Sequence, residues 1–229
     1  MIGIIGAMDV EVQAIKNKMY DIEEINYLDS IFYKGKIKDK EVVLCKSGVG
    51  KVNAAITTSI LLYHFDIDFV INIGTAGGMR SDQETLDIVI SDRVIQYDFD
   101  TSYLDGPEGL GIYCQSDKSL RDKVKEAFDK NHIKANIYFG DIISGDKFVG
   151  DNDLIKDLRQ KFPQAIACEM EAGAVGQACE KFSIPFVVIR SLSDIVDKDN
   201  SENDFLKNVE ITSKRSADMV ESFMENIDR

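Results

Sequence analysis

The segment 165–194 constrains the fold more than any other part of the chain. It begins with a short apolar run that ends in a pair of carboxylates, continues as an Ala/Gly-rich helical segment, and closes with a longer apolar run that ends in polar residues. This order predicts one βαβ unit with functional side chains at both strand ends. Ligands of open α/β sheets bind outside the carboxyl ends of the strands, so one crevice is predicted to collect Glu169, Glu171, Arg190, Ser193 and Asp194.

Strand-like and helix-like segments alternate along the rest of the chain, and no linker rich in Pro, Gly or Ser divides its 229 residues. We therefore predict a single α/β domain over residues 1–229, with three layers: a twisted, mixed, mostly parallel central sheet covered by helices on both faces. The predicted strands are 2–7, a hairpin over 31–46, 68–73, 86–97 and 137–143, and the predicted helices are 52–64, 118–131, 151–162 and 204–227.

Net charge narrows the class of ligand. The chain carries 40 acidic and 27 basic residues, which gives a formal net charge of −13. A field of this sign repels phosphate backbones and anionic membrane surfaces, so we expect no nucleic-acid partner and no membrane partner. No apolar run approaches the roughly 20 residues that span a bilayer, and no basic segment precedes the apolar start. These features predict a cytoplasmic protein that binds a small neutral or zwitterionic molecule.

The cysteines and histidines do not form a disulfide or metal pattern. CxxC spacing is absent, and neither histidine has metal-ligating neighbours in the sequence. We expect buried, reduced thiols and no metal site. The residues concerned are Cys45, Cys114, Cys168, Cys179, His64 and His132.

Several polar positions after predicted strands have two interpretations. Asp9 and Glu11 follow the first strand, where an acidic residue either serves chemistry or simply complements a helix dipole. Ser47-Gly48-Val49-Gly50-Lys51 has the wrong spacing for a phosphate loop and predicts a tight strand-to-helix turn. Gly74-Thr75-Ala76-Gly77-Gly78 is either an ordinary glycine turn or a close backbone approach to a ligand. Phe148 is either a core plug or a stacking platform for a planar base.

Seven motifs in register resemble those of bacterial 5′-methylthioadenosine/S-adenosylhomocysteine nucleosidases, which belong to the nucleoside phosphorylase-like superfamily. The resemblance covers nearly the whole chain. The motifs are Gly3-Ile4-Ile5-Gly6-Ala7-Met8, Ser47-Gly48-Val49-Gly50-Lys51, Gly74-Thr75-Ala76-Gly77-Gly78, Ser144-Gly145-Asp146, Phe162-Pro163-Gln164-Ala165, Glu169-Met170-Glu171-Ala172, and Pro185 through Asp194.

The resemblance implies a nucleoside phosphorylase-like fold and a homodimer. It also implies hydrolysis, without a cofactor, of the adenine N-glycosidic bond of 5′-methylthioadenosine and/or S-adenosylhomocysteine, with 5′-deoxyadenosine as a further candidate. The products would be adenine and a 5-thioribose, which places the reaction in methionine salvage and methyl-cycle recycling.

Residue roles follow from the same resemblance. Glu11 looks like the general base that activates water, Arg190 like a residue that holds that water or orients Glu11, and Asp194 like the acid that protonates purine N7. The implied substrate contacts are Glu171 and the Met170 backbone at the ribose, Phe148 and the Val149 backbone at adenine, and Thr75 and Gly77 on the sugar and water side. Met8, Val49 and Ser193 complete the predicted substrate-binding set, with Glu169 in support of the ribose site.

The chemistry of nucleoside hydrolysis independently favours this division of carboxylates. The sugar develops oxocarbenium character while the purine must leave as a neutral base, which requires a proton. One carboxyl must therefore be protonated and another ionised, and closely spaced carboxyls in a partly dry cleft push their pKa values apart.

Two other functions stay open at this stage. Phosphorylases on the same fold carry a phosphate-binding arginine three residues before the hydroxyl of the Gly-Ser/Thr segment, and this chain has Asn72 there, which favours water as the nucleophile. A non-catalytic nucleoside-binding or scaffold homologue is the second alternative.

Two departures from the family pattern affect the pocket for the 5′-substituent. The typical Tyr-His-Asp-Ala-Asp stretch reads Tyr97-Asp98-Phe99-Asp100 here, before a shortened loop that in relatives reaches across the dimer interface. Asn200-Ser201-Glu202-Asn203 also lacks the aromatic lid residue of relatives. The sequence therefore predicts adenine release but not the preferred 5′-substituent.

Overall fold

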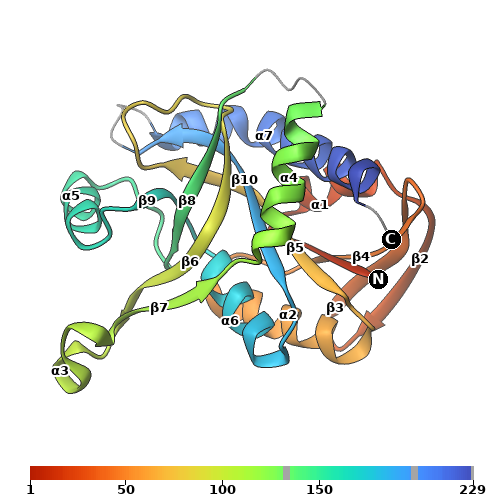
Figure 1. Cartoon of the computed structure of the whole chain (residues 1–229), viewed down its shortest axis with the longest axis horizontal. Helices are drawn as coiled ribbons and strands as arrows, with labels where there is room; N and C mark the ends of the chain where they lie inside the picture. The colour runs from red at the N-terminus through yellow and green to blue at the C-terminus, as the bar shows by residue number, and fades with distance from the viewer. Residues whose placement is uncertain (131–134, 197–200, 228–229) are drawn as a thin grey trace.

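The computed structural model describes residues 1–130, 135–196 and 201–227 (Figure 1). The strands are β1 (Ile2–Gly6), β2 (Tyr20–Tyr27), β3 (Ser30–Ile37), β4 (Lys40–Lys46), β5 (Phe69–Gly78), β6 (Ile88–Asp100), β7 (Leu110–Gln115), β8 (Ile137–Ser144), β9 (Ala165–Glu169) and β10 (Phe186–Ile195). The helices are α1 (Asp9–Lys16), α2 (Lys51–His64), α3 (Ser102–Asp105), the 3-10 helix η1 (Gly106–Gly109), α4 (Lys118–Lys130), α5 (Asn152–Lys161), α6 (Ala172–Phe182) and α7 (Ser201–Asn226).

The strands of the described residues form one sheet that partly closes on itself. Their order is β10-β6-β8-β9-β5-β1-β4-β3-β2, with β7 paired to β6. β10 also pairs in parallel with β5, so β10, β6, β8, β9 and β5 form a closed ring. Parallel pairs join β1 to both β4 and β5, and join β8 to both β6 and β9. The predicted α/β fold with a mixed, mostly parallel sheet is confirmed.

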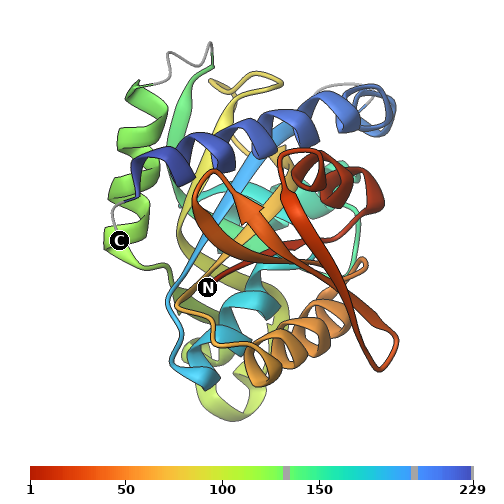
Figure 2. The same ribbon diagram turned by 90° about the vertical axis from the view of Figure 1, so that its right-hand side faces the viewer.

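Helices cover both faces of the sheet, as predicted. Figure 2 shows α7 on one side of the strands and α2 and α6 on the other. The first side also holds α1 and α4, whose apolar residues share one core cluster with α7 and with alternate positions of β1, β4 and β5. α2 and α6 contribute to a second cluster on the opposite face. α5 packs on a third, smaller cluster with residues of β6 and β8.

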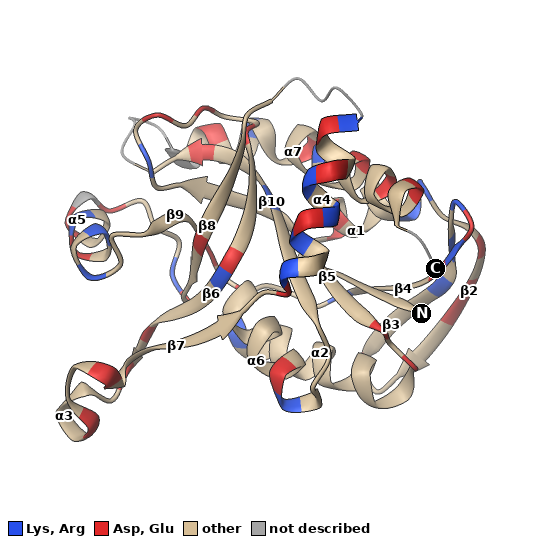
Figure 3. Ribbon diagram, viewed as in Figure 1, with Lys and Arg blue, Asp and Glu red and all other residues tan. Residues whose placement is uncertain are grey.

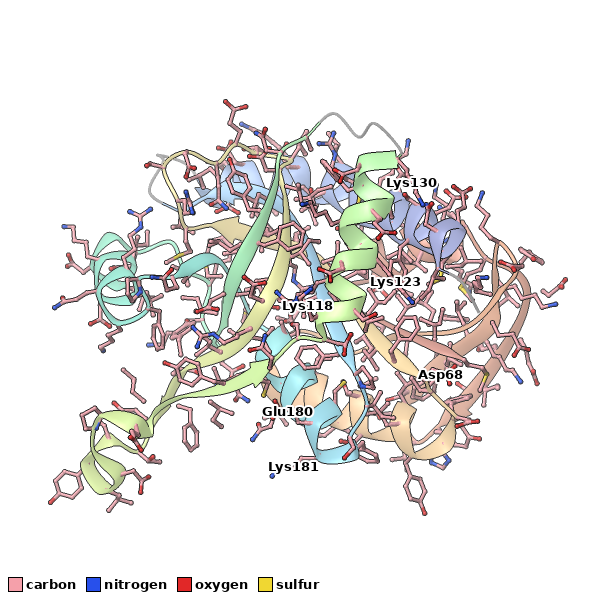
Figure 4. The ribbon with its side chains drawn as sticks, viewed as in Figure 1. Asp68, Lys118, Lys123, Lys130, Glu180 and Lys181 are labelled. Carbon is pink, nitrogen blue, oxygen red and sulfur yellow. The ribbon has the colours of Figure 1, made fainter. Side chains whose placement is uncertain are left out.

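α4 shows how side-chain spacing sets these layers. Leu120, Val124 and Ala127 recur at helical spacing and are buried against the sheet and α7. Lys118, Lys123 and Lys130 lie along the same helix (Figure 4). In Figure 3 the ribbon of α4 is marked by both blue and red segments, because basic and acidic residues occupy many of the positions between the buried ones.

The segment 165–194 forms the predicted strand, helix and strand, but the prediction of a parallel βαβ unit was wrong. β9 pairs antiparallel with β5, whereas β10 runs parallel to β5. The two strands are therefore not parallel neighbours. Their functional ends meet because the ring of strands closes, and not because both strands end at the same edge of an open sheet.

Three further differences concern the segment 74–78, β2 and the loop after β6. The segment 74–78 continues β5 and is not a turn; its glycines let β10 pack closely, since a Cβ on Gly77 or Gly78 would lie 2.7 or 2.6 Å from Val196 or Ile195. β2 was not predicted because it is an exposed edge strand of mostly polar residues. The loop predicted after Asp100 instead contains α3 and η1 and leads into β7.

The predicted turn between β4 and α2 and the hairpin of β3 and β4 are confirmed. The cysteines Cys45, Cys114, Cys168 and Cys179 are buried and free, as expected. Asn200 and His132 lie outside the described residues. Within the part of the chain that is described, no helix combines the length and apolar character needed to cross a membrane.

Candidate active site

A cleft opens where β5, β8, β9 and β10 meet the starts of α1, α2 and α7. Its volume is about 650 Å³ with its open mouth included. It is lined by Ala7, Met8, Glu11, Val49, Thr75, Ala76, Gly77, Lys147, Phe148, Val149, Cys168, Glu169, Met170, Glu171, Ser193, Asp194 and Phe205.

Nearly every predicted site residue lines this cleft. The exception is Arg190, which is fully buried and reaches the site through Glu169. Ala7, Ala76, Lys147, Cys168 and Phe205 line the cleft without having been predicted as site residues. Most of them directly adjoin predicted positions, so proximity in sequence was the available signal.

Glu11 is a buried carboxylate held by backbone donors. It lies in the first turn of α1, and its Oε2 accepts hydrogen bonds from the N–H groups of Ala7 at 2.7 Å and Met8 at 3.0 Å. Its Oε1 accepts from the Thr75 N–H at 3.1 Å. Burial raises the pKa of Glu11 above its ordinary value, although Arg190 and the three N–H groups act in the opposite direction. The carboxylate caps the helix and also faces the cleft.

The neighbouring Asp9 takes the simpler role. Its side chain is almost fully exposed and forms an ion pair with Lys46 at 2.8 Å. It does not line the cleft. Of the two acids that follow β1, only Glu11 therefore belongs to the site.

Gly74 brings Glu11 and Arg190 together. A Cβ at this position would lie 2.6 Å from Glu11 Oε1 and 3.0 Å from Arg190 Nη1. These distances leave no room for a side chain, so the carboxylate and the guanidinium both approach the β5 backbone. Because their charges are opposite, Glu11 and Arg190 each lower the free-energy cost of burying the other.

Two side chains accept hydrogen bonds from Arg190. Its Nη2 donates to Asn72 Oδ1 at 2.8 Å and to Glu169 Oε2 at 2.5 Å. Its Nε and Nη1 are buried and have no protein hydrogen-bond partner among the described residues. A buried guanidinium with unpaired donors is costly unless a further acceptor completes it, and water or substrate oxygen suits this geometry.

Glu169 lines the cleft, but its carboxylate is bonded mainly to other groups of the protein. Its carboxylate accepts from the N–H groups of Glu171 at 3.0 Å and Ala172 at 2.9 Å, and from the Ser144 hydroxyl. Together with the ion pair to Arg190, these bonds fix the start of α6 against β8 and β10. The support roles of Asn72 and Ser144 were not predicted, because buried polar residues inside strands give no local signal of function.

Glu171 projects from the position just before α6. Its Oε1 accepts from the Gly50 N–H at 2.9 Å. Burial and the nearby Glu169 charge raise the pKa of Glu171 to about 8, although Arg190 acts in the opposite direction. Glu171 is therefore able to hold a proton and donate or accept a hydrogen bond to a sugar hydroxyl.

Asp194 lies near the end of β10. Its Oδ1 accepts from the Ser193 hydroxyl at 2.7 Å, whereas its Oδ2 is buried and has no protein partner in the described chain. Burial raises the pKa of Asp194 from 3.8 to about 6, with a further contribution from Asp204 and an opposing one from Ser193. This carboxyl is suited to carry a proton near neutral pH.

Two phenylalanines form an aromatic wall at the mouth. Phe148 is 45% exposed and lines the cleft, so it is not a core plug. Its ring makes a T-shaped contact with Phe205 of α7, with centroids 5.9 Å apart. Val149, the next residue, is buried. An exposed ring beside a buried backbone suits a planar base that stacks on one residue and hydrogen-bonds the next.

Asn72 has no charge with which to hold a phosphate. The Asn72 side chain is buried; its Oδ1 accepts a hydrogen bond from Arg190, and its Nδ2 donates one to the Ile5 carbonyl. Among the described residues, no group of three or more His, Cys, Asp or Glu side chains could bind a metal ion.

Known proteins resemble this chain over nearly its whole length. Residues 1–225 match the family model described as the phosphorylase superfamily. The chain is similar to the 5′-methylthioadenosine/S-adenosylhomocysteine nucleosidase of Marinomonas sp. (strain MWYL1), with 41% identity over 231 residues that cover 98% of each chain.

Two solved structures also share this fold. The chain is similar to the 5′-methylthioadenosine/S-adenosylhomocysteine nucleosidase of Colwellia psychrerythraea 34H in complex with adenine, with a TM-score of 0.93, 33% identity, and coverage of 98% of this chain and 94% of that chain. It is similar to the futalosine hydrolase of Helicobacter pylori strain 26695, with a TM-score of 0.92, 32% identity, and coverage of 99% and 97%.

Proposed function

We propose that this chain, which belongs to the phosphorylase superfamily, hydrolyses the N-glycosidic bond of 5′-methylthioadenosine and/or S-adenosylhomocysteine and releases adenine. The other product is a 5-thioribose, which methionine salvage and methyl-cycle recycling would consume. 5′-Deoxyadenosine is a further candidate substrate. The full-length similarity to nucleosidases of this name supports the reaction class, and no cofactor takes part.

One observation carries the proposal: Glu11 and Asp194 line the same cleft but have different partners. Burial raises the pKa of Glu11, but three backbone hydrogen bonds and the nearby buried guanidinium act against burial and stabilise the ionised form that a general base needs. Asp194 has a pKa raised to about 6 by burial and an unpaired Oδ2. A base and an acid thus face one substrate space, as glycosidic hydrolysis needs.

The two groups divide the reaction between the sugar and the base. Protonated Asp194 donates to purine N7, so the bond between C1′ and N9 breaks and its electron pair leaves with neutral adenine. Water attacks the oxocarbenium-like C1′, and Glu11 accepts the proton that the water loses. Arg190 would hold that water or orient Glu11, in support of which its Nε and Nη1 have no protein partner among the described residues and its Nη1 lies beside Gly74, as Glu11 does.

Other predicted residues would place the nucleoside. Glu171 and the Met170 backbone would bind the ribose hydroxyls, in support of which Glu171 is itself fixed by Gly50. Phe148 would stack on adenine, and the Val149 backbone would read the edge of the base. Thr75, Gly77, Met8, Val49 and Ser193 would complete the surround of the sugar and its 5′-substituent.

An adenine-release assay tests the proposal directly. We expect the wild type to release adenine from 5′-methylthioadenosine, and we expect Glu11→Gln to lose about 10²–10⁴-fold in kcat. Asp9→Asn is the matched control, because Asp9 lies two residues away but points into solvent. Equal losses in the two variants, or near-normal turnover of Glu11→Gln, would remove Glu11 from the mechanism.

The phosphorylase alternative predicts a different requirement. A phosphorylase needs phosphate as the nucleophile and yields a sugar phosphate, whereas the present proposal predicts the same rate with and without phosphate. The engagement of Asn72 with Arg190 favours hydrolysis. A strict phosphate requirement would reverse this conclusion. A binding titration that shows affinity without adenine release would instead favour a non-catalytic homologue.

The similarity to a futalosine hydrolase makes the 5′-substituent a separate question. The assay should therefore compare 5′-methylthioadenosine, S-adenosylhomocysteine, 5′-deoxyadenosine and futalosine at equal concentration. A kcat/KM for futalosine well above the other three would assign the chain to that branch of the family.

We also propose that the chain acts as a single-domain homodimer in the cytoplasm. The outer face of α2 exposes Val52, Ile56 and Tyr63, and the ribbon of this helix is almost entirely tan in Figure 3, because it holds few charged residues. The projecting arm formed by β6, α3 and β7 exposes Tyr103 and Leu104 (Figure 1). A dimer would cover these apolar surfaces. Sedimentation at micromolar concentration should show a dimer for the wild type and a monomer for Ile56→Asp.

A further inference from the structure

Three segments near the cleft meet at a lysine that does not line it. Lys51 is the first residue of α2, and its side chain is mostly buried. Its Nζ forms an ion pair with Asp98 Oδ1, near the outer end of β6, and lies 3.8 Å from Asp146 Oδ2, in the loop after β8. This cluster has no place in the reaction described above.

Backbone groups extend the cluster. The Lys51 N–H donates to Asp146 Oδ1 at 2.9 Å, and the Asp146 N–H donates to Asp98 Oδ2 at 3.0 Å. Burial alone would raise the pKa of Asp98, but the hydrogen bonds from Lys51 and from the Asp146 N–H hold it below its ordinary value. Asp98 is therefore ionised across the neutral range, and the cluster keeps its charges there.

Two of the segments held in this way carry proposed substrate contacts. Gly50, directly before Lys51, donates its N–H to Glu171 Oε1 at 2.9 Å. Asp146 lies shortly before Phe148 and Val149 in the same loop. The two segments touch, since a Cβ on Gly50 would lie 3.3 Å from Asp146 Oδ1. A shift of one relative to the other would change the distance between the ribose contact and the aromatic base platform.

We propose that Lys51 is a positioning residue that fixes the spacing between the ribose contact at Glu171 and the base platform at Phe148 and Val149. The inference rests on the proposed function, because it assumes a nucleoside that spans both subsites. Asp146 is half-exposed, so its 3.8 Å contact to Nζ adds little by itself. The Asp98 ion pair and the two backbone hydrogen bonds do the positioning. Asp98 also lies in β6 at the base of the projecting arm of β6, α3 and β7, so its ion pair with Lys51 links that arm to the start of α2.

The kinetic signature of such a residue differs from that of a catalytic one. Lys51→Met keeps most of the side-chain stem but removes its charge. We expect the KM for 5′-methylthioadenosine to rise about tenfold while kcat changes by less than about threefold, because weakening the bound substrate and the transition state equally raises KM alone. The dissociation constant of free adenine, measured by calorimetry, should rise less than the KM, since adenine occupies only one of the two subsites.

Conservative and matched variants separate positioning from general stability. Lys51→Arg should restore most of the affinity because it keeps the cation. Lys46→Met removes another lysine ion pair five residues earlier, on the surface, and should leave KM unchanged. Asp98→Asn should raise KM as Lys51→Met does, and the double variant should be no worse than either single one, because both remove the same ion pair.

The inference fails if Lys51→Met and Asp98→Asn leave KM unchanged, if their effects add, or if kcat falls at constant KM. Should Lys51→Met not fold, as judged by circular dichroism, Asp98→Asn carries the test alone. Failure of the proposed function is distinguishable: the wild type would then release no adenine, and calorimetric binding of 5′-methylthioadenosine and of adenine would still report whether Lys51 couples the two subsites.

Discussion

Replacement of Asp194 by Asn should greatly lower the activity of the protein and, above neutral pH, raise its stability. Burial raises the pKa of this carboxyl from 3.8 to about 6. At roughly 1.4 kcal/mol for each pH unit, that interval corresponds to about 3 kcal/mol. Because the folded pKa is the higher one, the stabilisation from the neutral form is complete below pH 3.8 and is lost as pH rises through 6.

The variant removes this pH dependence from the free energy of unfolding. An Asn side chain stays neutral and keeps an oxygen to accept the Ser193 hydroxyl, which now donates to Asp194 Oδ1 at 2.7 Å. At about pH 8 we expect Asp194→Asn to be more stable than the wild type by up to about 3 kcal/mol, and the difference should shrink as pH falls to about 5. Urea unfolding at a fixed protein concentration measures both values.

Activity should change in the opposite direction. Asp194→Asn cannot donate the proton to purine N7, so kcat should fall by about 10²–10⁴-fold. In the wild type, kcat/KM should decline as pH rises above about 6, because the acid becomes ionised in the free enzyme. Asp204→Asn is the control: it removes a neighbouring charge that raises the pKa of Asp194, so it should move the decline to lower pH without abolishing turnover.

The burial argument is refuted if Asp194→Asn is no more stable than the wild type at about pH 8, since Asp194 would then not be an uncompensated buried carboxylate there. The proton-donor role is refuted if the variant turns over at a near-normal rate. A loss of activity with unchanged stability would leave the proton-donor role intact but contradict the burial argument.

Three further outcomes follow from the site. Gly74→Ala should retain its fold but lose most activity in the adenine-release assay, because the new Cβ would lie 2.6 Å from Glu11 Oε1; full activity would contradict this steric argument. Arg190→Met should lower the free energy of unfolding by about 3–5 kcal/mol in urea, because it leaves Glu169 buried without its cation, and a change below about 1 kcal/mol would count against it. The four cysteines, Cys45, Cys114, Cys168 and Cys179, should react with a thiol reagent only when the protein unfolds, because all are buried and burial raises their pKa values. Fast labelling of the folded protein would disprove this.

The order of elements was predictable because apolar periodicity reports burial locally. Helices such as α2, α4 and α6 agree with their patterns to within a residue or two. β2 was not predicted, because an exposed edge strand has no apolar face and so no alternating apolar pattern in its sequence. The direction of β9 could not be predicted, since pairing partners are set by closure of the ring and not by the residues of β9 itself.

Site residues were predictable where they follow strands. Glu11, Glu171 and Asp194 all lie at or just beyond the end of an apolar run, and the structure brings them to one cleft. Of the two interpretations of the segment 74–78, the turn was wrong, because its glycines here continue a strand and let it approach Glu11 and β10 closely. Asn72 and Ser144 act through Arg190 and Glu169, a relation that only the folded chain displays.

The closed ring of strands also sets when the chain can become an enzyme. β10 is the last strand to be synthesised, and it inserts between β5 and β6, which were made much earlier. A nascent chain that ends before β10 holds Glu11 but neither Arg190 nor Asp194, and it leaves two strand edges open to wrong partners. Ring closure therefore protects the sheet from aggregation and completes the active site in the same step.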